Sequence, residues 1–114
     1  MSRVYKILCR RAWTEAKTTG AYTGSPLDVN DGFIHLSTAA QAAETARLHF
    51  RGQADLIIAG FEAEAFGSAL RWEPSRGGEL FPHLYAALPI AAAVSIDDLP
   101  LDAANIPITP ALAP

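Results

Sequence analysis

One stretch near the middle of the chain, Asp31 to Thr38 (DGFIHLST), constrains the fold more than any other. It begins with the turn signal Asp-Gly, continues with apolar residues that favour an extended chain, and ends on a threonine. Thr38 and Gln41, three residues later, have the form of a capping box, which predicts that a helix starts there. A turn, a strand and a helix start therefore follow one another without a linker.

His35 and Ser37 are two residues apart in the extended part of this stretch. Because side chains alternate between the two faces of a strand, both should point to one face, where they would form the wall of a site. The structural alternative is a histidine packed in the strand and a serine beside a helix cap, with no ligand. A second polar cluster later in the chain favours a site.

Hydrophobic patterning predicts the remaining elements and an α+β class, because strands and helices follow one another without regular alternation. Residues 55–61 are apolar without helical spacing, which predicts a central strand buried on both faces. Pro82 lacks an amide hydrogen, so we expect its segment at a sheet edge or bulge. The other predictions are strands at 4–8, 33–36, 70–73 and 91–96, helices at 10–17 and 38–50, and loops at 22–30 and 74–78.

The length of 114 residues suits one domain with a buried core, and we expect that domain to span residues 1–96. Residues 97–114 are rich in proline, which predicts a C-terminal tail that packs on the domain or frays from it. The single cysteine, Cys9, excludes an internal disulfide and predicts a reducing, cytoplasmic location. Cys9 lies beside Leu8 at a predicted strand end. We therefore interpret it as a small core residue rather than a nucleophile.

The charge balance narrows the choice of partners. The formal net charge is −3, so we expect no duplex nucleic acid as a partner. No segment approaches the roughly 18 consecutive apolar residues of a spanning helix, so we expect no membrane partner either. A small-molecule or nucleotide ligand remains, and nothing in the sequence indicates an oligomeric state.

The second polar cluster runs from Arg71 to Tyr85. Strand alternation puts Arg71 and Glu73 on one face opposite Trp72, and His83 and Tyr85 together on a face. In a structural interpretation Glu73 pairs with an arginine at the surface, worth about 0–1 kcal/mol, and the aromatic rings are buried. In a functional interpretation the guanidinium groups of Arg71 and Arg76 suit phosphate or carboxylate, and the aromatic planes suit a base. These groups together indicate a nucleotide ligand.

Other chemistries lack their motifs in this sequence. The chain has no phosphate-binding loop, no dinucleotide glycine fingerprint and no nucleophile elbow. The histidines at 35, 49 and 83 could in principle bind a metal with Glu73, but no two of these histidines are at i,i+4 spacing, so no metal site is expected.

These motifs resemble those of an uncharacterised bacterial family, domain-of-unknown-function family 952, over residues 4–96. The resemblance is carried by Tyr5-Lys6-Ile7, Asp31 to Ser37, Arg71-Trp72-Glu73 and Phe81 to Tyr85. That family is similar in fold to the ADP-ribosyltransferases, and His35-Leu36-Ser37 is similar to the His-Leu-Ser strand of their RNA 2′-phosphotransferase branch. The resemblance implies an ADP-ribosyltransferase-like fold, with a mixed or antiparallel split sheet, one main helix and one short helix.

The resemblance also implies a site and a ligand, NAD or a nucleotide-like molecule. Tyr5 and Lys6 would line the first strand position, and Ser37 with His35 the second. Glu73 is the nearest candidate for the catalytic glutamate, so His35 and Glu73 are the catalytic candidates. At the first strand position this chain departs from the transferase pattern, because it has Lys6-Ile7 where many transferases have His-Gly. The expected ligand-binding residues are Tyr5, Lys6, Ser25, His35, Ser37, Thr38, Arg71, Trp72, Arg76, His83 and Tyr85.

Two functional hypotheses stay open on the sequence. The first is an enzyme, an NAD-dependent glycosyl (ADP-ribosyl) transferase or one acting on a phosphorylated nucleotide. The second is a non-catalytic small-molecule-binding module or a protein-interaction domain.

Overall fold

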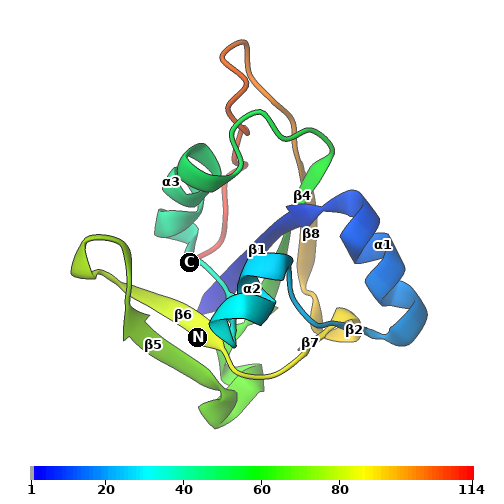
Figure 1. Cartoon of the computed structure of the whole chain (residues 1–114), viewed down its shortest axis with the longest axis vertical. Helices are drawn as coiled ribbons and strands as arrows, with labels where there is room; N and C mark the ends of the chain where they lie inside the picture. Colours follow the sequence, from blue (N-terminus) through cyan, green and yellow to red (C-terminus); the bar gives the residue numbers. More distant parts are fainter. Residues whose placement is uncertain (1) are drawn as a thin grey trace.

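Two three-stranded antiparallel sheets form the frame of the computed structural model, which describes residues 2–114 except for the side chain of Arg76 (Figure 1). The first sheet has the order β1 (Arg3–Cys9), β4 (Leu56–Glu62), β8 (Ser95–Leu99), and the second the order β3 (Ile34–His35), β6 (Leu80–Leu84), β5 (Leu70–Pro74). A short antiparallel ladder joins β2 (Ala21–Tyr22) to β7 (Leu88–Pro89). The predicted α+β class with antiparallel sheets is confirmed.

The two large sheets meet at a bridge between Tyr5 and Ser37. The amide of Tyr5 donates to the carbonyl of Ser37 at 2.8 Å, and the amide of Ser37 donates back to the carbonyl of Tyr5 at 2.9 Å. This bridge holds β1 beside the chain that leaves β3. Lys6, the next residue of β1, therefore lies next to His35. The carbonyl of His35 accepts a hydrogen bond from the Lys6 ammonium.

Three α-helices cover the sheets: α1 (Arg10–Thr19), α2 (Pro26–Asp31) and α3 (Ala39–His49). The predicted capping box is confirmed, because the Thr38 side chain accepts from the amide of Gln41 and the Gln41 side chain accepts from the amide of Thr38. α1 ends at Gly20, whose φ of 87° is in the left-handed region that favours glycine. The expectation of one main and one short helix is wrong, because α1 and α3 have 10 and 11 residues. Three 3-10 segments complete the chain at Ala63–Ala69, Arg76–Gly78 and Ile90–Ala92.

The loop predicted at 22–30 is wrong in its second half, where α2 forms. Ser25 caps this helix, Pro26 occupies its first turn, and Asp28 completes a capping box with the Ser25 amide. Serine, proline, aspartate and asparagine favour turns, but they also favour the first turn of a helix. With only six residues, α2 is too short to show a helical period.

The end of the chain also differs from its prediction. The last strand is β8, Ser95–Leu99, instead of 91–96, so the expected domain boundary at residue 96 lies inside a strand. β8 is an edge strand whose middle residues are exposed, and it therefore lacks the apolar run that marks a buried strand. Beyond it, Leu112 packs against the core and the hydroxyl of Tyr5 donates to the carbonyl of Ala113. The tail thus packs on the domain.

Pro82 lies in the middle strand of the second sheet, so its prediction as an edge or bulge residue is wrong. In an antiparallel strand the amide and carbonyl of one residue point to the same neighbour. The carbonyl of Pro82 accepts from Leu36 at 3.1 Å, on the side where β3 ends. The amide hydrogen that Pro82 lacks would also point to the side of β3. The hydrogen bonds between β6 and β5 are therefore unaffected.

β1 and β4 of the first sheet are buried on both faces. Val4, Leu8 and Ile57 pack on one face with Trp13 of α1, while Tyr5 and Ile58 belong to a cluster on the other face with residues of α3. The prediction of a doubly buried central strand at 55–61 is confirmed, because residues 56–61 are all buried.

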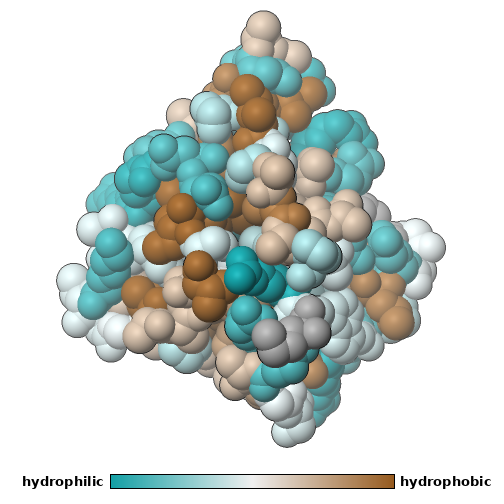
Figure 2. Space-filling view, turned by 180° about the vertical axis from the view of Figure 1, so that it is seen from behind, coloured by the Kyte–Doolittle hydropathy of each residue, from teal (hydrophilic) through white to brown (hydrophobic). Residues whose placement is uncertain are grey.

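The surface mixes polar and apolar side chains. Figure 2 shows small apolar groups lying between polar ones on the face behind that of Figure 1. Leu27, Val29 and Trp72 are among the exposed large apolar residues, so part of the 50% hydrophobic composition lies outside the core. Among the described residues, the helices are all too short or too polar to cross a membrane.

The central strand contains a glycine whose replacement tests this packing. A Cβ atom on Gly60 would lie 2.8 Å from Cε1 of Tyr5 and also collide with the hydroxyl of Ser95. We expect Gly60→Ala to lower the free energy of unfolding in urea by about 1–3 kcal/mol, because the core is overpacked. Adding Ser95→Gly should recover part of that loss. Unchanged stability of the single variant would contradict this account of the β1-β4-β8 packing.

Candidate functional site

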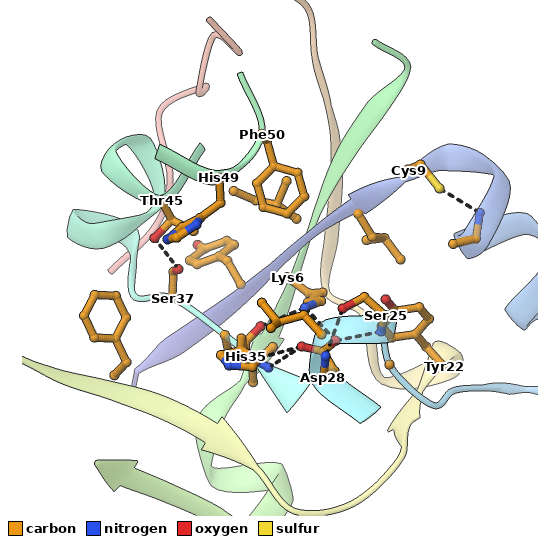
Figure 3. A pocket seen from close by; sticks show the side chains of 18 of the residues that line it. Lys6, Cys9, Tyr22, Ser25, Asp28, His35, Ser37, Thr45, His49 and Phe50 are labelled. Carbon is orange, nitrogen blue, oxygen red and sulfur yellow. Dashed lines mark hydrogen bonds and ion pairs between the residues drawn. The ribbon is translucent and has the colours of Figure 1, made fainter. Parts of the chain in front are cut away.

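A cavity of about 640 Å³ lies where the two sheets meet, and Figure 3 shows the side chains around it. Residues of β1, α2, β3, α3 and β6 form its walls. Its volume lies within the roughly 300–1,000 Å³ range of small-molecule sites. The cavity is therefore the candidate site, and its polar groups are described next.

Lys6 places an ammonium group on the wall formed by β1. The side chain is buried, and Nζ donates to Oδ2 of Asp28 at 2.9 Å and to the carbonyl of His35 at 3.1 Å. Burial lowers the pKa of Lys6, while the charge of Asp28 and its hydrogen bond act in the opposite direction. Lysines are almost never fully buried unless they are paired. Asp28 is thus the residue that makes this position of Lys6 tolerable.

Asp28 accepts hydrogen bonds on both carboxylate oxygens. Oδ2 accepts from Lys6 and from the amide of Ser25, the latter at 2.8 Å. Oδ1 accepts from the amide of His35 at 3.1 Å and lies 2.6 Å from its Nδ1. Burial alone would raise the pKa of Asp28, but the hydrogen bond with His35 and the charge of Lys6 hold that pKa well below its usual value. Asp28 is therefore ionised and ties together three elements.

Both ring nitrogens of His35 face carboxylates. Nδ1 contacts Asp28, and Nε2 lies 2.9 Å from Oδ2 of Asp31. Contacts on both sides of the ring fix the orientation of His35 at the cavity wall. A ligand reaches Nε2 only by displacing the partly exposed Asp31 carboxylate.

A second carboxylate–histidine pair joins β5 to β6. Nδ1 of His83 lies 2.8 Å from Oε1 of Glu73, and the hydroxyl of Tyr85 donates to the same oxygen at 2.7 Å. These hydrogen bonds, that of Tyr85 first, lower the pKa of Glu73, and the bond to Glu73 raises the pKa of Tyr85. His83 lines the cavity, but Glu73 does not. Glu73 therefore reaches the cavity only through His83.

Aromatic rings hold this pair in place. The ring of Phe33 stacks on His83 with centroids 4.0 Å apart and also lies 5.3 Å from the ring of Tyr85. The guanidinium of Arg71 lies 4.6 Å from the centroid of Tyr85. Cation–π and stacking contacts of this kind restrict the rotation of the rings.

The two predicted polar segments do come together, but side by side rather than across a cleft. β3 and β6 are neighbours in one sheet, and His35 and His83 are register partners with ring centroids 5.7 Å apart. Both histidines therefore line the cavity from the same sheet.

The ligand-binding residues predicted from the sequence divide into two groups. Four of them do not line the cavity: Thr38, Arg71, Trp72 and Tyr85. Thr38 is a helix cap, and Trp72 is 43% exposed on an edge strand. Arg76 has its side chain outside the described part of the structure. The predicted residues that do line the cavity are Tyr5, Lys6, Ser25, His35, Ser37 and His83.

Sequence reasoning missed other cavity residues, above all Asp28. Its capping-box spacing from Ser25 was the available signal. Thr45 and His49 of α3 also line the cavity, and the Thr45 hydroxyl lies 3.0 Å from that of Ser37. Cys9 was predicted in the core, but it is exposed and its sulfur caps α1, because the strand ends there. Over residues 2–114, no cluster of three or more His, Cys, Asp or Glu side chains is arranged to hold a metal ion.

Comparison with known proteins identifies similar chains. The family model with the description "Protein of unknown function (DUF952)" matches residues 7–96. The crystal structure of protein CC0527 from Caulobacter crescentus is similar, with 50% identity, a TM-score of 0.91 and coverage of 94% of each chain. The solution NMR structure of CC0527 gives a TM-score of 0.84 and covers 94% of this chain and 92% of that one. No match was found among curated proteins.

The buried ion pair gives a first prediction for the site. Asp28→Asn should lower the free energy of unfolding by about 3–5 kcal/mol, because it leaves the Lys6 ammonium buried without a countercharge. Asp31→Asn is the matched control on the same helix. Asp31 is partly exposed, so this change should cost less than about 1 kcal/mol. Equal losses in the two variants, measured by urea unfolding, would refute the special role of Asp28.

The depressed pKa of Asp28 predicts a pH dependence of stability. A carboxylate whose pKa is lower in the folded state contributes stability that is present above its unfolded pKa of about 4 and lost as the pH falls. Urea unfolding from pH 7 down to pH 2.5 should therefore show a flatter decline below about pH 4 for Asp28→Asn than for the unchanged protein. Parallel curves would mean that Asp28 does not titrate in this window.

Proposed function

The chain belongs to the family described as "Protein of unknown function (DUF952)", and we propose that it binds a nucleotide-like small molecule, with NAD as the first candidate. The observation that carries this proposal is the cavity of about 640 Å³ with polar groups on one wall and aromatic rings on others. A ligand with both hydroxyl-rich and planar parts fits such a lining.

The polar wall offers hydrogen bonds that suit a sugar. The hydroxyls of Ser37 and Thr45 point toward each other at the cavity (Figure 3) and can each donate and accept. Lys6 has three ammonium hydrogens, and the structure assigns partners to two of them, Asp28 and the carbonyl of His35. The third hydrogen is the one offered to a ligand oxygen.

The aromatic walls suit a planar ring. Tyr22, Phe50 and Phe81 line the same cavity, and Tyr22 is buried with a pKa raised by that burial, so its hydroxyl stays neutral. Apolar and aromatic walls with a few placed polar groups are typical of sites for small cofactors.

The enzyme hypothesis is ADP-ribosyl transfer, which the similarity of the His35-Leu36-Ser37 strand supports. In that reaction the bond between nicotinamide and ribose breaks, nicotinamide leaves, and an acceptor oxygen bonds to the ribose after losing its proton. The Tyr5–Ser37 bridge puts the two strand positions expected to hold NAD beside each other. Glu73 acts in this scheme through His83, because its own carboxylate is outside the cavity lining.

The second candidate is a non-catalytic binding module. The observation in its favour is that the charged groups on the cavity wall satisfy one another: Lys6 pairs with Asp28, and His35 lies between Asp28 and Asp31. A site in which these charges are already neutralised can bind a ligand without performing chemistry on it.

Binding can be tested with two tryptophan substitutions on α3. Thr45 faces the cavity, whereas Ala43 is exposed. Thr45→Trp should weaken the binding of NAD roughly ten-fold or more, since the indole fills ligand space, and Ala43→Trp should leave the Kd unchanged. Isothermal titration calorimetry gives both constants, and the melting temperature checks that each variant is folded. No binding of NAD, adenosine or NMN to the unchanged protein would reject the nucleotide proposal.

Release of nicotinamide then separates the two candidates. If the protein binds NAD and chromatography detects nicotinamide above the rate in buffer, the transferase hypothesis holds. Binding without nicotinamide release favours the module.

A further inference from the structure

We infer that His83 is the proton acceptor of the cavity and that Glu73 positions it: Nδ1 holds its hydrogen toward the carboxylate, and Nε2 presents a lone pair to the ligand. The inference rests on the proposed function in taking the cavity as the ligand site. It adds a role for a residue and a class of chemistry to that site.

The tautomer of His83 follows from its partner. An ionised carboxylate only accepts hydrogen bonds, so Nδ1 must donate across the 2.8 Å to Glu73. In the neutral ring the single hydrogen is then on Nδ1, and Nε2 is an acceptor. The Tyr85 hydroxyl donates to the same carboxylate oxygen, which keeps Glu73 in the position that orients the ring.

Nε2 is open to the cavity. His83 is 5% exposed and lines the cavity, and no described residue supplies a hydrogen bond to Nε2. Within residues 2–114, the fully buried side-chain polar atoms without a partner belong to Trp13 and Thr109. Nε2 is therefore reached by solvent, and the accessible space beside His83 is the cavity.

The other two histidines of the cavity differ in this respect. His35 faces a carboxylate at each nitrogen, so a ligand reaches neither nitrogen without displacing a carboxylate. His49 lies at the exposed end of α3, where the described residues give its ring no carboxylate. His83 alone among these three rings combines a carboxylate on one nitrogen with an open second nitrogen.

The surroundings of His83 suit a proton acceptor. Phe33 stacks on one side of the ring, which restricts its rotation. The charged and titratable groups that face it are Glu73 and Arg71 from β5, Tyr85 directly after β6, and His35 from β3. When Nε2 takes a proton, the imidazolium donates from both nitrogens and Glu73 balances its charge.

The chemistry assigned to this site is the transfer of one proton from a ligand or acceptor O–H to Nε2. The O–H bond breaks, its electron pair stays on oxygen, and that oxygen becomes the nucleophile, while His83 carries the proton. In the proposed ADP-ribosyl transfer this oxygen is the one that replaces nicotinamide on the ribose. The acceptor is therefore expected to be a hydroxyl compound.

Long-range ¹H–¹⁵N NMR of the free protein tests the tautomer. We expect the Nδ1–H form for neutral His83, retention of that form in Glu73→Gln, whose amide oxygen still accepts, and its loss in Glu73→Ala. A glutamate that does not orient the ring would leave the tautomer unchanged when replaced. An Nε2–H form in the unchanged protein, or no response to Glu73→Ala in a folded variant, would overturn the inference.

Acylation by diethyl pyrocarbonate tests access to Nε2. Peptide mass spectrometry should find His83 modified roughly ten-fold faster than His35, because acylation of His35 requires a charge-assisted hydrogen bond to break. Thr45→Trp, which fills the cavity, should slow the modification of His83 relative to Nα-acetylhistidine added to the same reaction. A His83 that stays unmodified while His49 reacts would refute the open nitrogen. Both measurements use the free protein, so a failure of NAD to bind would not affect them.

Discussion

The buried ion pair between Lys6 and Asp28 is the contact on which the rest of the site depends. β1 is covered on both faces, so the side chain of Lys6 in its middle is almost completely buried and needs a charged partner inside the protein. α2 supplies that partner, since Asp28 is its buried residue. Asp28 in turn bonds the backbone of Ser25 and His35, so a single carboxylate connects β1, α2 and β3. The position of one cavity wall is therefore a consequence of charge compensation.

The molecule contains two carboxylate–histidine pairs that differ in what remains open. In the pair of Asp28 and His35, a second carboxylate occupies the remaining nitrogen, and the ring is a fixed part of the wall. In the pair of Glu73 and His83, the remaining nitrogen faces the cavity. The two rings are register partners in adjacent strands, so the same sheet presents one closed and one open imidazole to a ligand. A closed ring orients, whereas an open ring is available for proton transfer.

Sequence patterns predicted those elements whose signals are local. The cap at Thr38, a strand at His35 and the buried strand at 55–61 follow from adjacent residues and were found, whereas the predicted turn at Asp31-Gly32 is the C-terminal end of α2. α2 was missed because it is short and its stability comes from a partner 22 positions away, Lys6. β8 was misplaced because an edge strand needs few apolar residues, and its pairing with β4 is a long-range property.

The candidate site was half predictable for a similar reason. Alternation correctly put His35 and Ser37 toward one space, since it depends only on neighbouring positions. Alternation does not specify strand order, and strand order determines which residues of the second cluster line the cavity. β6 is the middle strand, so His83 is buried against the cavity, whereas β5 is the edge, so Trp72 is exposed and Glu73 lies outside the lining. A residue pattern therefore names the chemical groups available, but the order of strands selects which group meets a ligand and which only orients its neighbour.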